Sequence, residues 1–342
     1  MSDIHHHGYI PRVDAVRVLL MAAVVLSVYR LPVRFTRYFA LLCEFAPCAL
    51  FALYGYFVLR FHNTTFSLKR SLFSALRVFS KLLFAYVVLG FLYQWLMVGN
   101  PVSWLNLPNI LTFLIFNKWP INLGDSIWML QSVLYALAVF TLLHRFSHNK
   151  VVDYVACGVL MVLGVVLGEM AGVLRMPFYL ERNFLTTTIP YMLLGKLLRY
   201  APDKIKNCKS KVLVLLFGGG VVLCAAEALF LRSKGAIDTC QNLIGFIPMT
   251  AATLLFAVRG PKKEAINAAD IRLMETYRFM YFLFNPIAEF YFLLSILLIG
   301  FPKLFNAAAG ATAIVTLVLS FLLARAVGRF RSKQVVIPDE HR

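Results

Sequence analysis

The 342-residue chain is poor in charge: Asp, Glu, Lys and Arg together make up only 15% of it. Hydrophobic residues make up 60%, and the mean hydropathy is +0.75. A water-soluble domain covers its surface with polar groups, and this composition supplies too few of them. A bilayer can solvate such a chain if each segment satisfies its own backbone hydrogen bonds as a helix. The shortage of charge therefore excludes a soluble domain and predicts an all-α polytopic membrane protein.

The sequence also lacks the patterns of a disulfide framework, a metal centre or a cleavable signal peptide. Its six cysteines form no Cys-x-x-Cys pair, and most lie inside apolar runs, which predicts buried free thiols. His5-His6-His7 is only a weak metal-binding pattern, so we expect no bound metal. The first apolar run, 16–31, is followed by Arg34 and Arg37 rather than by a small-residue cleavage site, so we interpret it as a permanent span.

Ten apolar runs have about the length of a helix that crosses a bilayer. We expect spans at 14–32, 38–60, 76–98, 126–144, 151–173, 184–200, 211–231, 239–258, 276–299 and 304–325. A further apolar stretch, 104–116, is too short to cross and is expected to be a re-entrant or interfacial helix on the outer side. The sequence has no internal repeat. We therefore expect one transmembrane domain at 14–325, between cytoplasmic segments at 1–13 and 326–342.

Basic residues outnumber acidic ones, 34 to 16, and the formal net charge is +18. With ten spans and a cytoplasmic N-terminus, the inner loops carry more than twice as many Lys and Arg as the outer loops, which agrees with the positive-inside rule. Both termini are therefore expected in the cytoplasm. The charge is interpreted as a basic inner face toward anionic lipids or an anionic co-substrate, rather than as a nucleic-acid site.

Ionisable and polar side chains inside the expected spans are costly and mark candidate functional positions. Asp14 and Arg17 lie three residues apart, so they share a helix face and are expected to form an ion pair. The other such positions are Glu44, Lys81, Gln131, Glu169, Glu227, Arg278 and Glu289. Each is either a member of an internal pair, a side chain that reaches toward a helix end, or part of a functional cleft.

Several short motifs follow one another in a characteristic order. They are Arg12–Arg17, Leu50–Phe57, Leu68–Arg70 with Arg77, Ile127–Leu130, Ile189–Gly195 and Tyr281–Pro286. Together with ten spans and a short inserted helix, their order and spacing resemble the acyltransferase family 3 membrane proteins over about residues 10–325. The resemblance implies a ten-helix bundle, in a bacterial inner membrane, that transfers acetyl or other acyl groups from acyl-CoA to cell-surface or lipid-linked glycans.

The resemblance also implies roles for individual residues. Asp14 and Arg17 match the polar pair of the family's first span, and Tyr281 and Asn285 lie in the span-nine motif. The groups implied for acyl-CoA binding are Lys69, Arg70, Arg77 and Trp128. The positive-inside rule alone also accounts for the three basic residues, and an anchoring role at the membrane interface also accounts for the tryptophan. Gly55 and Gly195 are expected to allow close contact between helices.

Two histidines of the family pattern are missing. The catalytic histidine expected about fourteen residues after Asp14 falls at Val28, and Phe284 stands in the span-nine pattern where the second is expected. Transfer of an acyl group to a hydroxyl needs a general base, and histidine suits that task, whereas valine and phenylalanine cannot perform it. The candidates for a replacement base are Glu44, His62 and Tyr29.

Three functions follow from these observations. The first is a membrane acyltransferase of the family-3 type, with acyl-CoA and a glycan as substrates. The second is a catalytically impaired relative that acts as a non-enzymatic partner in envelope polysaccharide assembly, which the missing histidines favour. The third is a transporter or flippase of lipid-linked sugar, with the polar groups of the spans along its path, although the sequence has no inverted repeat.

Overall fold

The computed structural model describes residues 9–28, 42–61, 64–117, 127–143, 149–175, 182–235, 242–263, 266–296, 298 and 301–336. Within these ranges the chain is helical and has no β-strand, apart from an isolated antiparallel bridge between Tyr9 and Lys263. The all-helical prediction is confirmed. The chain divides into two compact units: unit 1 is Met1–Cys43 with Phe256–Arg342, and unit 2 is Glu44–Leu255. The single domain expected at 14–325 stays a prediction.

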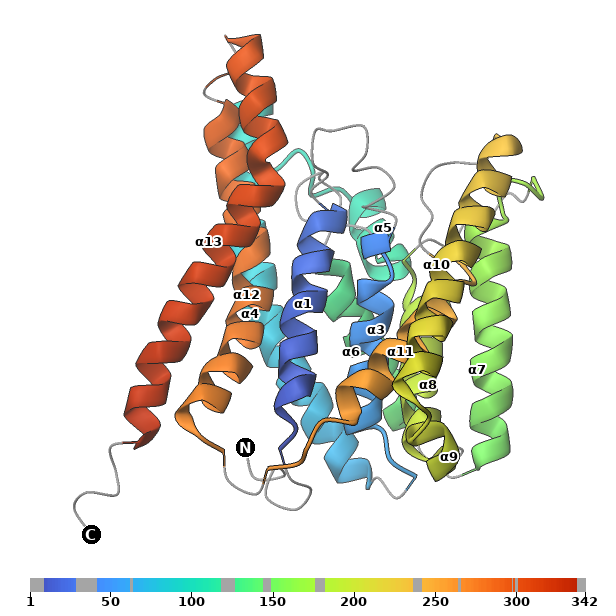
Figure 1. Cartoon of the computed structure of the whole chain (residues 1–342). Helices are drawn as coiled ribbons and strands as arrows, with labels where there is room; N and C mark the ends of the chain where they lie inside the picture. The colour runs from blue at the N-terminus through green and yellow to red at the C-terminus, as the bar shows by residue number, and fades with distance from the viewer. Residues whose placement is uncertain are drawn as a thin grey trace. The chain divides into compact units, whose positions relative to one another are not determined.

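Unit 1 is built around three long helices: α1 (Pro11–Val28), α12 (Ala268–Ile296) and α13 (Pro302–Val336). Proline suits the first turn of a helix, because its fixed φ fits and its missing N–H would have no partner there. Both α12 and α13 pack on α1, and they pack extensively on each other. Figure 1 shows α1 (blue) and α12 (orange) running in the same direction, while α13 (red) returns alongside α12.

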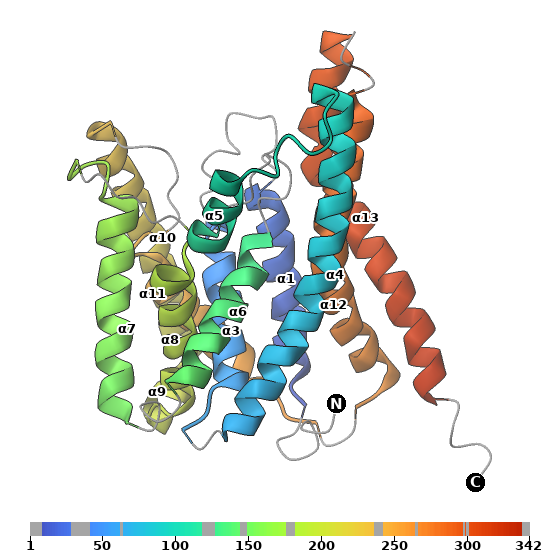
Figure 2. The same ribbon diagram turned by 180° about the vertical axis from the view of Figure 1, so that it is seen from behind.

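Unit 2 contains most of the remaining helices. Its elements are α3 (Ala46–Val58), α4 (Thr65–Val98), α5 (Leu107–Phe116), α6 (Ile127–Leu142), α7 (Lys150–Gly164), α8 (Ile189–Arg199), α9 (Asp203–Lys206), α10 (Ser210–Ser233) and most of α11 (Phe246–Val258), with π-helical turns η1 (Val165–Glu169) and η2 (Phe184–Thr188). Helix α3 packs on α8, α8 on α7, and α4 on α6 (Figure 2).

Two glycines allow the backbones of α3 and α8 to touch. A Cβ atom on Gly55 would lie 2.1 Å from the carbonyl oxygen of Met192. A Cβ atom on Gly195 would lie 2.0 Å from the carbonyl oxygen of Ala52. Neither position has room for a side chain, so the close helix contact predicted from these glycines is confirmed.

Helix α4 is longer than the span expected within it. It begins after the N-cap Thr64, whose hydroxyl accepts the N–H of Ser67, and ends at Gly99, which has a φ of 74°. Its 34 residues extend about 51 Å at 1.5 Å per residue, against a hydrocarbon core of roughly 30 Å. The basic stretch and the span at 76–98 therefore belong to one continuous helix.

Each of the ten expected spans contains a helix, and among the described residues four helical segments are long and apolar enough to cross a membrane. These are Thr65–Val98, Lys150–Glu169, Ser210–Ser233 and Ala311–Arg331. Shorter apolar helices occur at Ala46–Val58, Leu107–Phe116, Ile127–Leu142 and Phe246–Val258. The chain is therefore a helical membrane protein, and the count of ten spans stays a prediction.

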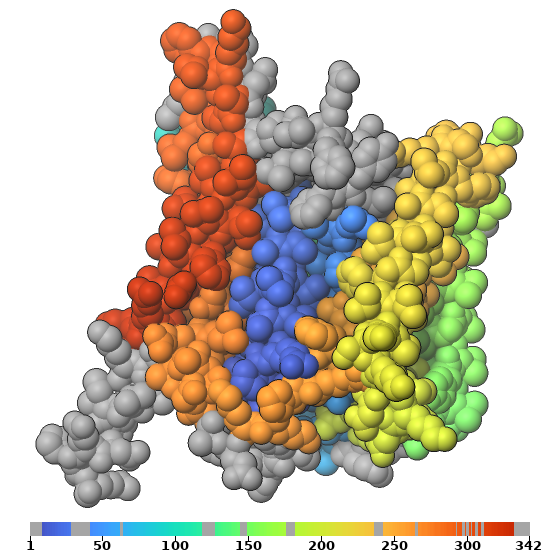
Figure 3. Space-filling view, viewed as in Figure 1, coloured from blue at the N-terminus to red at the C-terminus, as the bar shows by residue number. Residues whose placement is uncertain are grey.

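Helix α10 presents an apolar outer surface on unit 2, seen in yellow in Figure 3. Val214, Leu215 and Val222 are mostly exposed on this helix. In water such a surface would favour aggregation, whereas in a bilayer it contacts the acyl chains. Cys43, Cys48, Cys157 and Cys224 are buried, as their apolar surroundings predict.

Candidate functional site

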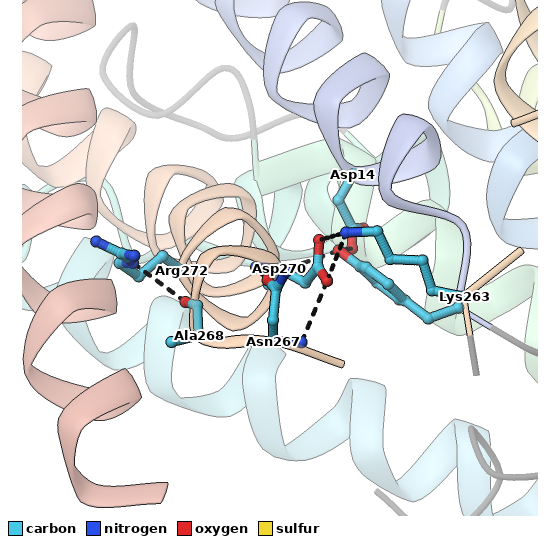
Figure 4. Close-up of polar contacts among 7 residues, drawn as sticks. Asp14, Lys263, Asn267, Ala268, Asp270 and Arg272 are labelled. Carbon is cyan, nitrogen blue, oxygen red and sulfur yellow. Dashed lines mark hydrogen bonds and ion pairs between the residues drawn. The ribbon is translucent and has the colours of Figure 1, made fainter. Parts of the chain in front are cut away.

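A buried polar network lies where the start of α1 meets the start of α12 in unit 1 (Figure 4). Asp14 is its central acceptor and is almost fully buried. Arg17 Nη1 donates to Asp14 Oδ1 at 2.9 Å, and the Tyr9 hydroxyl donates to Asp14 Oδ2, also at 2.9 Å. The ion pair expected between Asp14 and Arg17 is confirmed, and both oxygens of the buried carboxylate have a donor.

The second acid of this network, Asp270, joins the start of α12 to the loop before it. Lys263 Nζ lies 3.0 Å from both carboxylate oxygens of Asp270. Asn267 Oδ1 accepts the Asp270 N–H at 2.9 Å, and Asp270 Oδ2 accepts the Asn267 N–H at 3.2 Å. This reciprocal arrangement is a capping box, which satisfies two N–H groups at the helix start. A carboxylate is also favoured there by the helix dipole.

Backbone hydrogen bonds connect the two parts of the network. The Tyr9 N–H donates to the Lys263 carbonyl at 2.9 Å, and the Lys263 N–H donates to the Tyr9 carbonyl at 2.7 Å. The Tyr9 hydroxyl lies 3.3 Å from the Asp270 carbonyl oxygen. Burial raises the pKa of Tyr9, and the negative charge of Asp14 raises it further. Tyr9 is therefore a neutral hydrogen-bond donor at physiological pH.

Like Lys263, whose side chain is 40% exposed, Arg17 reaches the surface of unit 1. Its side chain is 23% exposed, whereas that of Asp14 is 4% exposed. The Arg17 guanidinium carbon lies 5.5 Å from the ring centroid of Tyr277, within cation–π range. A buried carboxylate and an aromatic ring thus hold one positive charge in a defined orientation. Such a group is suited to binding an anionic ligand.

Sequence analysis did not identify Tyr9, Lys263 or Asp270 as members of this site. The pattern Asn267-x-x-Asp270 before an apolar run is a recognisable capping signal and would have placed the start of α12. No local signal, however, connects Tyr9 with Lys263, because they are 254 positions apart in the chain.

Unit 2 contains a buried ion pair between α7 and α8. Lys196 Nζ lies 2.7 Å from Asp153 Oδ2, and the lysine side chain is 0% exposed. The Lys196 ammonium also lies 4.4 Å from the ring centroid of Phe61, and the Lys150 ammonium lies 5.6 Å from the same centroid. A buried charge requires a partner of opposite sign, so this pair connects the two helices.

The end of α3 is tied to the end of α8 beside this pair. The Phe61 N–H donates to the Tyr200 hydroxyl at 3.2 Å, and the two rings lie 4.4 Å apart. Arg199 Nη1 donates to the Tyr56 carbonyl at 2.8 Å. The candidate base His62 follows Phe61 and lies outside the described residues.

The residues implied for donor binding lie in unit 2. Lys69, Arg70 and Arg77 are exposed along α4. Trp128 is buried at the start of α6, edge-on to Phe51 with the ring centroids 5.7 Å apart. The tryptophan ring therefore contacts protein in this structure.

The remaining candidates are distributed over both units. Glu44 is half-buried in the turn that precedes α3 in unit 2. Tyr281 and the buried Asn285 lie one turn apart on α12 in unit 1, and Val28 is the last residue of α1. Tyr29 is outside the ranges that the structure describes. The convergence of Arg17, Glu44 and the basic stretch on one cleft stays a prediction.

The short helix α5 confirms the inserted helix expected at 104–116. Its last carbonyls are satisfied by side chains of α6: Gln131 Nε2 donates to the Phe113 carbonyl at 2.8 Å, and the Tyr135 hydroxyl donates to the Leu114 carbonyl at 2.9 Å. A helix that ends in a low-dielectric environment needs such partners for its free carbonyls. Gln131 thus stabilises the fold, and the location of α5 at the membrane surface stays a prediction.

Two further carboxylates of the expected spans hold the segment before α11. Glu169 Oε1 accepts the Asn242 N–H at 3.0 Å. The two carboxylate oxygens of Glu227 accept the N–H groups of Ile244 and Gly245, both at 3.1 Å. These contacts give both acids a role in the fold that requires no transport path.

In the described part of the chain, no group of three His, Cys, Asp or Glu side chains is placed to hold a metal ion. Comparison with models of protein families, with curated proteins and with solved structures finds no match. The resemblance to acyltransferase family 3 therefore rests on the ordered motifs of this chain.

Proposed function

We propose that the chain is an integral membrane acyltransferase of the family-3 type, which transfers an acetyl or other acyl group from acyl-CoA to a cell-surface or lipid-linked glycan. One observation carries the proposal: Asp14 and Arg17, which the resemblance singles out, form a fixed ion pair in a network that includes the start of α12. The same helix carries the span-nine motif. Two separate motifs of the resemblance thus belong to one packed unit.

The charges of the molecule support an anionic donor. Arg17 is held by Asp14 and by the Tyr277 ring while part of its side chain remains exposed. Lys69, Arg70 and Arg77 are exposed on the N-terminal part of α4, a helix that is longer than a bilayer span. Lysine binds phosphate as a point charge, and arginine binds it with a two-pronged fork. Acyl-CoA carries several phosphates, so it matches such groups.

We also propose the orientation that this chemistry requires. With ten spans in a bacterial inner membrane and both termini in the cytoplasm, the basic start of α4 faces the cytoplasmic donor. Single cysteines introduced at Lys204 and Lys234 test this orientation. A membrane-impermeant thiol reagent applied to intact spheroplasts should label only Lys234→Cys, and labelling of only Lys204→Cys would reverse the orientation.

The activity is tested with the purified full-length protein in lipid nanodiscs. Acetyl-CoA labelled in its acetyl group is added with glycolipid extracted from bacterial envelopes, and both labelled glycolipid and released CoA thiol are measured. We expect transfer by the wild type and a loss of at least tenfold in Arg17→Ala, since charge-assisted contacts contribute about 1.5–3 kcal/mol. Lys234→Ala is the matched control. Absence of transfer from acyl donors of several chain lengths would reject the proposal.

A non-enzymatic partner in envelope polysaccharide assembly is the second candidate. The presence of Val28 and Phe284 in place of histidines favours it, because neither side chain can accept a proton. This candidate predicts no transfer in the nanodisc assay, together with loss of envelope polysaccharide when the gene is deleted. It also predicts full complementation of that deletion by Arg17→Ala.

A further inference from the structure

Glu289 is a buried carboxyl group in the C-terminal third of α12. Its side chain is 2% exposed, and Oε1 has no hydrogen-bond partner among the described residues. By contrast, Glu169 and Glu227 accept backbone N–H groups. An incompletely paired carboxyl group within a membrane helix is costly, and such groups are retained mainly where they act in binding or chemistry.

The backbone beside Glu289 is interrupted. Pro286 lies inside α12 and has no N–H to donate, so the carbonyl of Phe282 loses its usual helical partner. Asn285, next to the proline, is buried as well. Two turns of α12 therefore carry a carboxyl group, an amide and a carbonyl that lacks its usual helical N–H, all of which can bind a hydroxyl group.

Helix α13 brings two hydroxyl groups to the same level. The helices are antiparallel and are aligned by the 3.3 Å contact between Arg331 Nη1 and Glu275 Oε2. Glu289 lies about 21 Å along α12 from Glu275, and the same distance along α13 from Arg331 leads to the turn that contains Thr316. Thr316 and Thr312, one turn apart, are buried, and Thr316 Oγ1 has no hydrogen-bond partner in the described ranges.

Helix α1 reaches the same level of unit 1. It runs parallel to α12, and Arg17 stands over the Tyr277 ring. From that contact Val28 lies about 16 Å further along α1, and Glu289 lies about 18 Å further along α12. Glu289 is thus level with Val28, the position at which the resemblance leads one to expect the catalytic histidine.

We propose that Glu289 is the general base of the acyl transfer, and that Thr312, Thr316 and Asn285 hydrogen-bond the acceptor hydroxyl beside it. This inference rests on the proposed acyltransferase function and names the group that replaces the histidine. A desolvated carboxylate accepts a proton more strongly than a hydrated one, which suits it to an alcohol.

The reaction step is balanced without a further reactant. Glu289 takes the proton of the acceptor hydroxyl as its oxygen bonds to the thioester carbonyl carbon. The carbon–sulfur bond then breaks, and the departing CoA thiolate takes the proton from Glu289. The products are the acylated acceptor and free CoA thiol, and Glu289 returns to its ionised form.

The experiment measures transfer in nanodiscs for three variants of the full-length protein. Glu289→Gln should lower turnover by about 10²–10⁴-fold, the usual contribution of a general base. Glu289→Asp keeps a carboxyl group on a shorter side chain and should give an intermediate rate. The double variant Val28→His with Glu289→Gln should transfer the acyl group at least tenfold faster than Glu289→Gln alone, because the histidine is introduced at the same level of unit 1. Arg272→Gln, at an exposed position on the same helix, is the control and should change turnover by less than about threefold.

The outcomes separate the two proposals. Transfer at the wild-type rate by Glu289→Gln would overturn the base and leave the acyltransferase function intact. No transfer by the wild type would overturn both. If Glu289→Gln does not fold, Glu289→Asp tests the role of Glu289 as the base. An unchanged rate of transfer would overturn that role. A reduced rate would support it, provided that the variant elutes as the wild type does and keeps the same thermal midpoint.

Discussion

The Lys196 and Glu227 side chains of unit 2 differ from the Glu289 and Arg17 side chains of unit 1, although unit 2 also holds buried hydroxyl groups without a partner among the described residues, such as that of Thr188. In unit 2, Lys196 is paired with Asp153, and Glu227 holds two backbone N–H groups. In unit 1, Glu289 has an oxygen without a partner among the described residues, and Arg17 remains partly exposed. A group whose hydrogen bonds are all made within the protein stabilises the fold. A group that keeps spare bonding capacity at a cost in stability is the better candidate for chemistry.

The largest change in stability is expected at the buried pair of unit 2. Asp153→Asn leaves the Lys196 ammonium buried without a counter-charge and should lower the free energy of unfolding by about 3–5 kcal/mol. Denaturant titration of the detergent-solubilised protein measures it. Asp203→Asn, at an exposed pair with Lys206, is the control and should cost about 0–1 kcal/mol. Equal costs in the two variants would contradict the assignment of Asp153 as the charge partner of Lys196.

A glycine pair tests how tightly unit 2 is packed. Gly195→Ala puts a methyl group against the Ala52 carbonyl and should cost about 1–3 kcal/mol of unfolding free energy. Gly218 in α10 has open space at its Cβ position, so Gly218→Ala should stabilise by roughly 0.5–1 kcal/mol. In the same assay, the free energy of unfolding should therefore fall in Gly195→Ala and rise in Gly218→Ala. A neutral Gly195→Ala would show that α3 and α8 can move apart at little cost.

Within unit 1, Tyr9→Phe removes the hydrogen bond to the buried Asp14 carboxylate. We expect a loss of about 1–2 kcal/mol at neutral pH, where Tyr9 is protonated. Because the pKa of Tyr9 is raised in the folded protein, its contribution is complete below the unfolded pKa of about 10 and is lost as the pH rises above that value. The difference in unfolding midpoint between wild type and Tyr9→Phe should therefore shrink in alkaline buffer. A difference in unfolding midpoint that is constant up to pH 11 would contradict the stabilising role of the Tyr9 hydroxyl.

The smallest change in stability is expected at Glu289. Glu289→Gln removes no hydrogen bond at Oε1, so its unfolding free energy should stay within about 1 kcal/mol of the wild type, in contrast to Asp153→Asn. Unfolding curves of the two variants, measured side by side, give the comparison directly. A loss at Glu289→Gln as large as that at Asp153→Asn would remove the distinction between these two carboxyl groups.

The sequence alone predicts a good part of the local structure. A helix in the first expected span, the short helix within 104–116 and the Asp14–Arg17 pair all follow from spacing of a few residues along one helix. The close approach at Gly55 and Gly195 follows from residue type. The long helix α4 was harder to predict, because its polar first turns interrupt the apolar run that marks the span.

The site depends on contacts that no local pattern specifies. Tyr9 meets Lys263, and Asp153 meets Lys196, only when helices distant in sequence pack together. The level of Glu289 relative to Thr316 depends on the register between α12 and α13, which no local pattern in either segment specifies. For the same reason Glu289 was visible in the sequence as a charged residue in a span, but without a role.

What the sequence by itself determined is the kind of molecule. With so little charge, the chain can be solvated only by lipid, and in lipid the backbone must form its hydrogen bonds within each segment as a helix. What only the tertiary structure decided is which polar side chains find partners. A hydrogen bond requires atoms within about 3 Å, and that distance is set by how helices pack rather than by where residues stand in the chain.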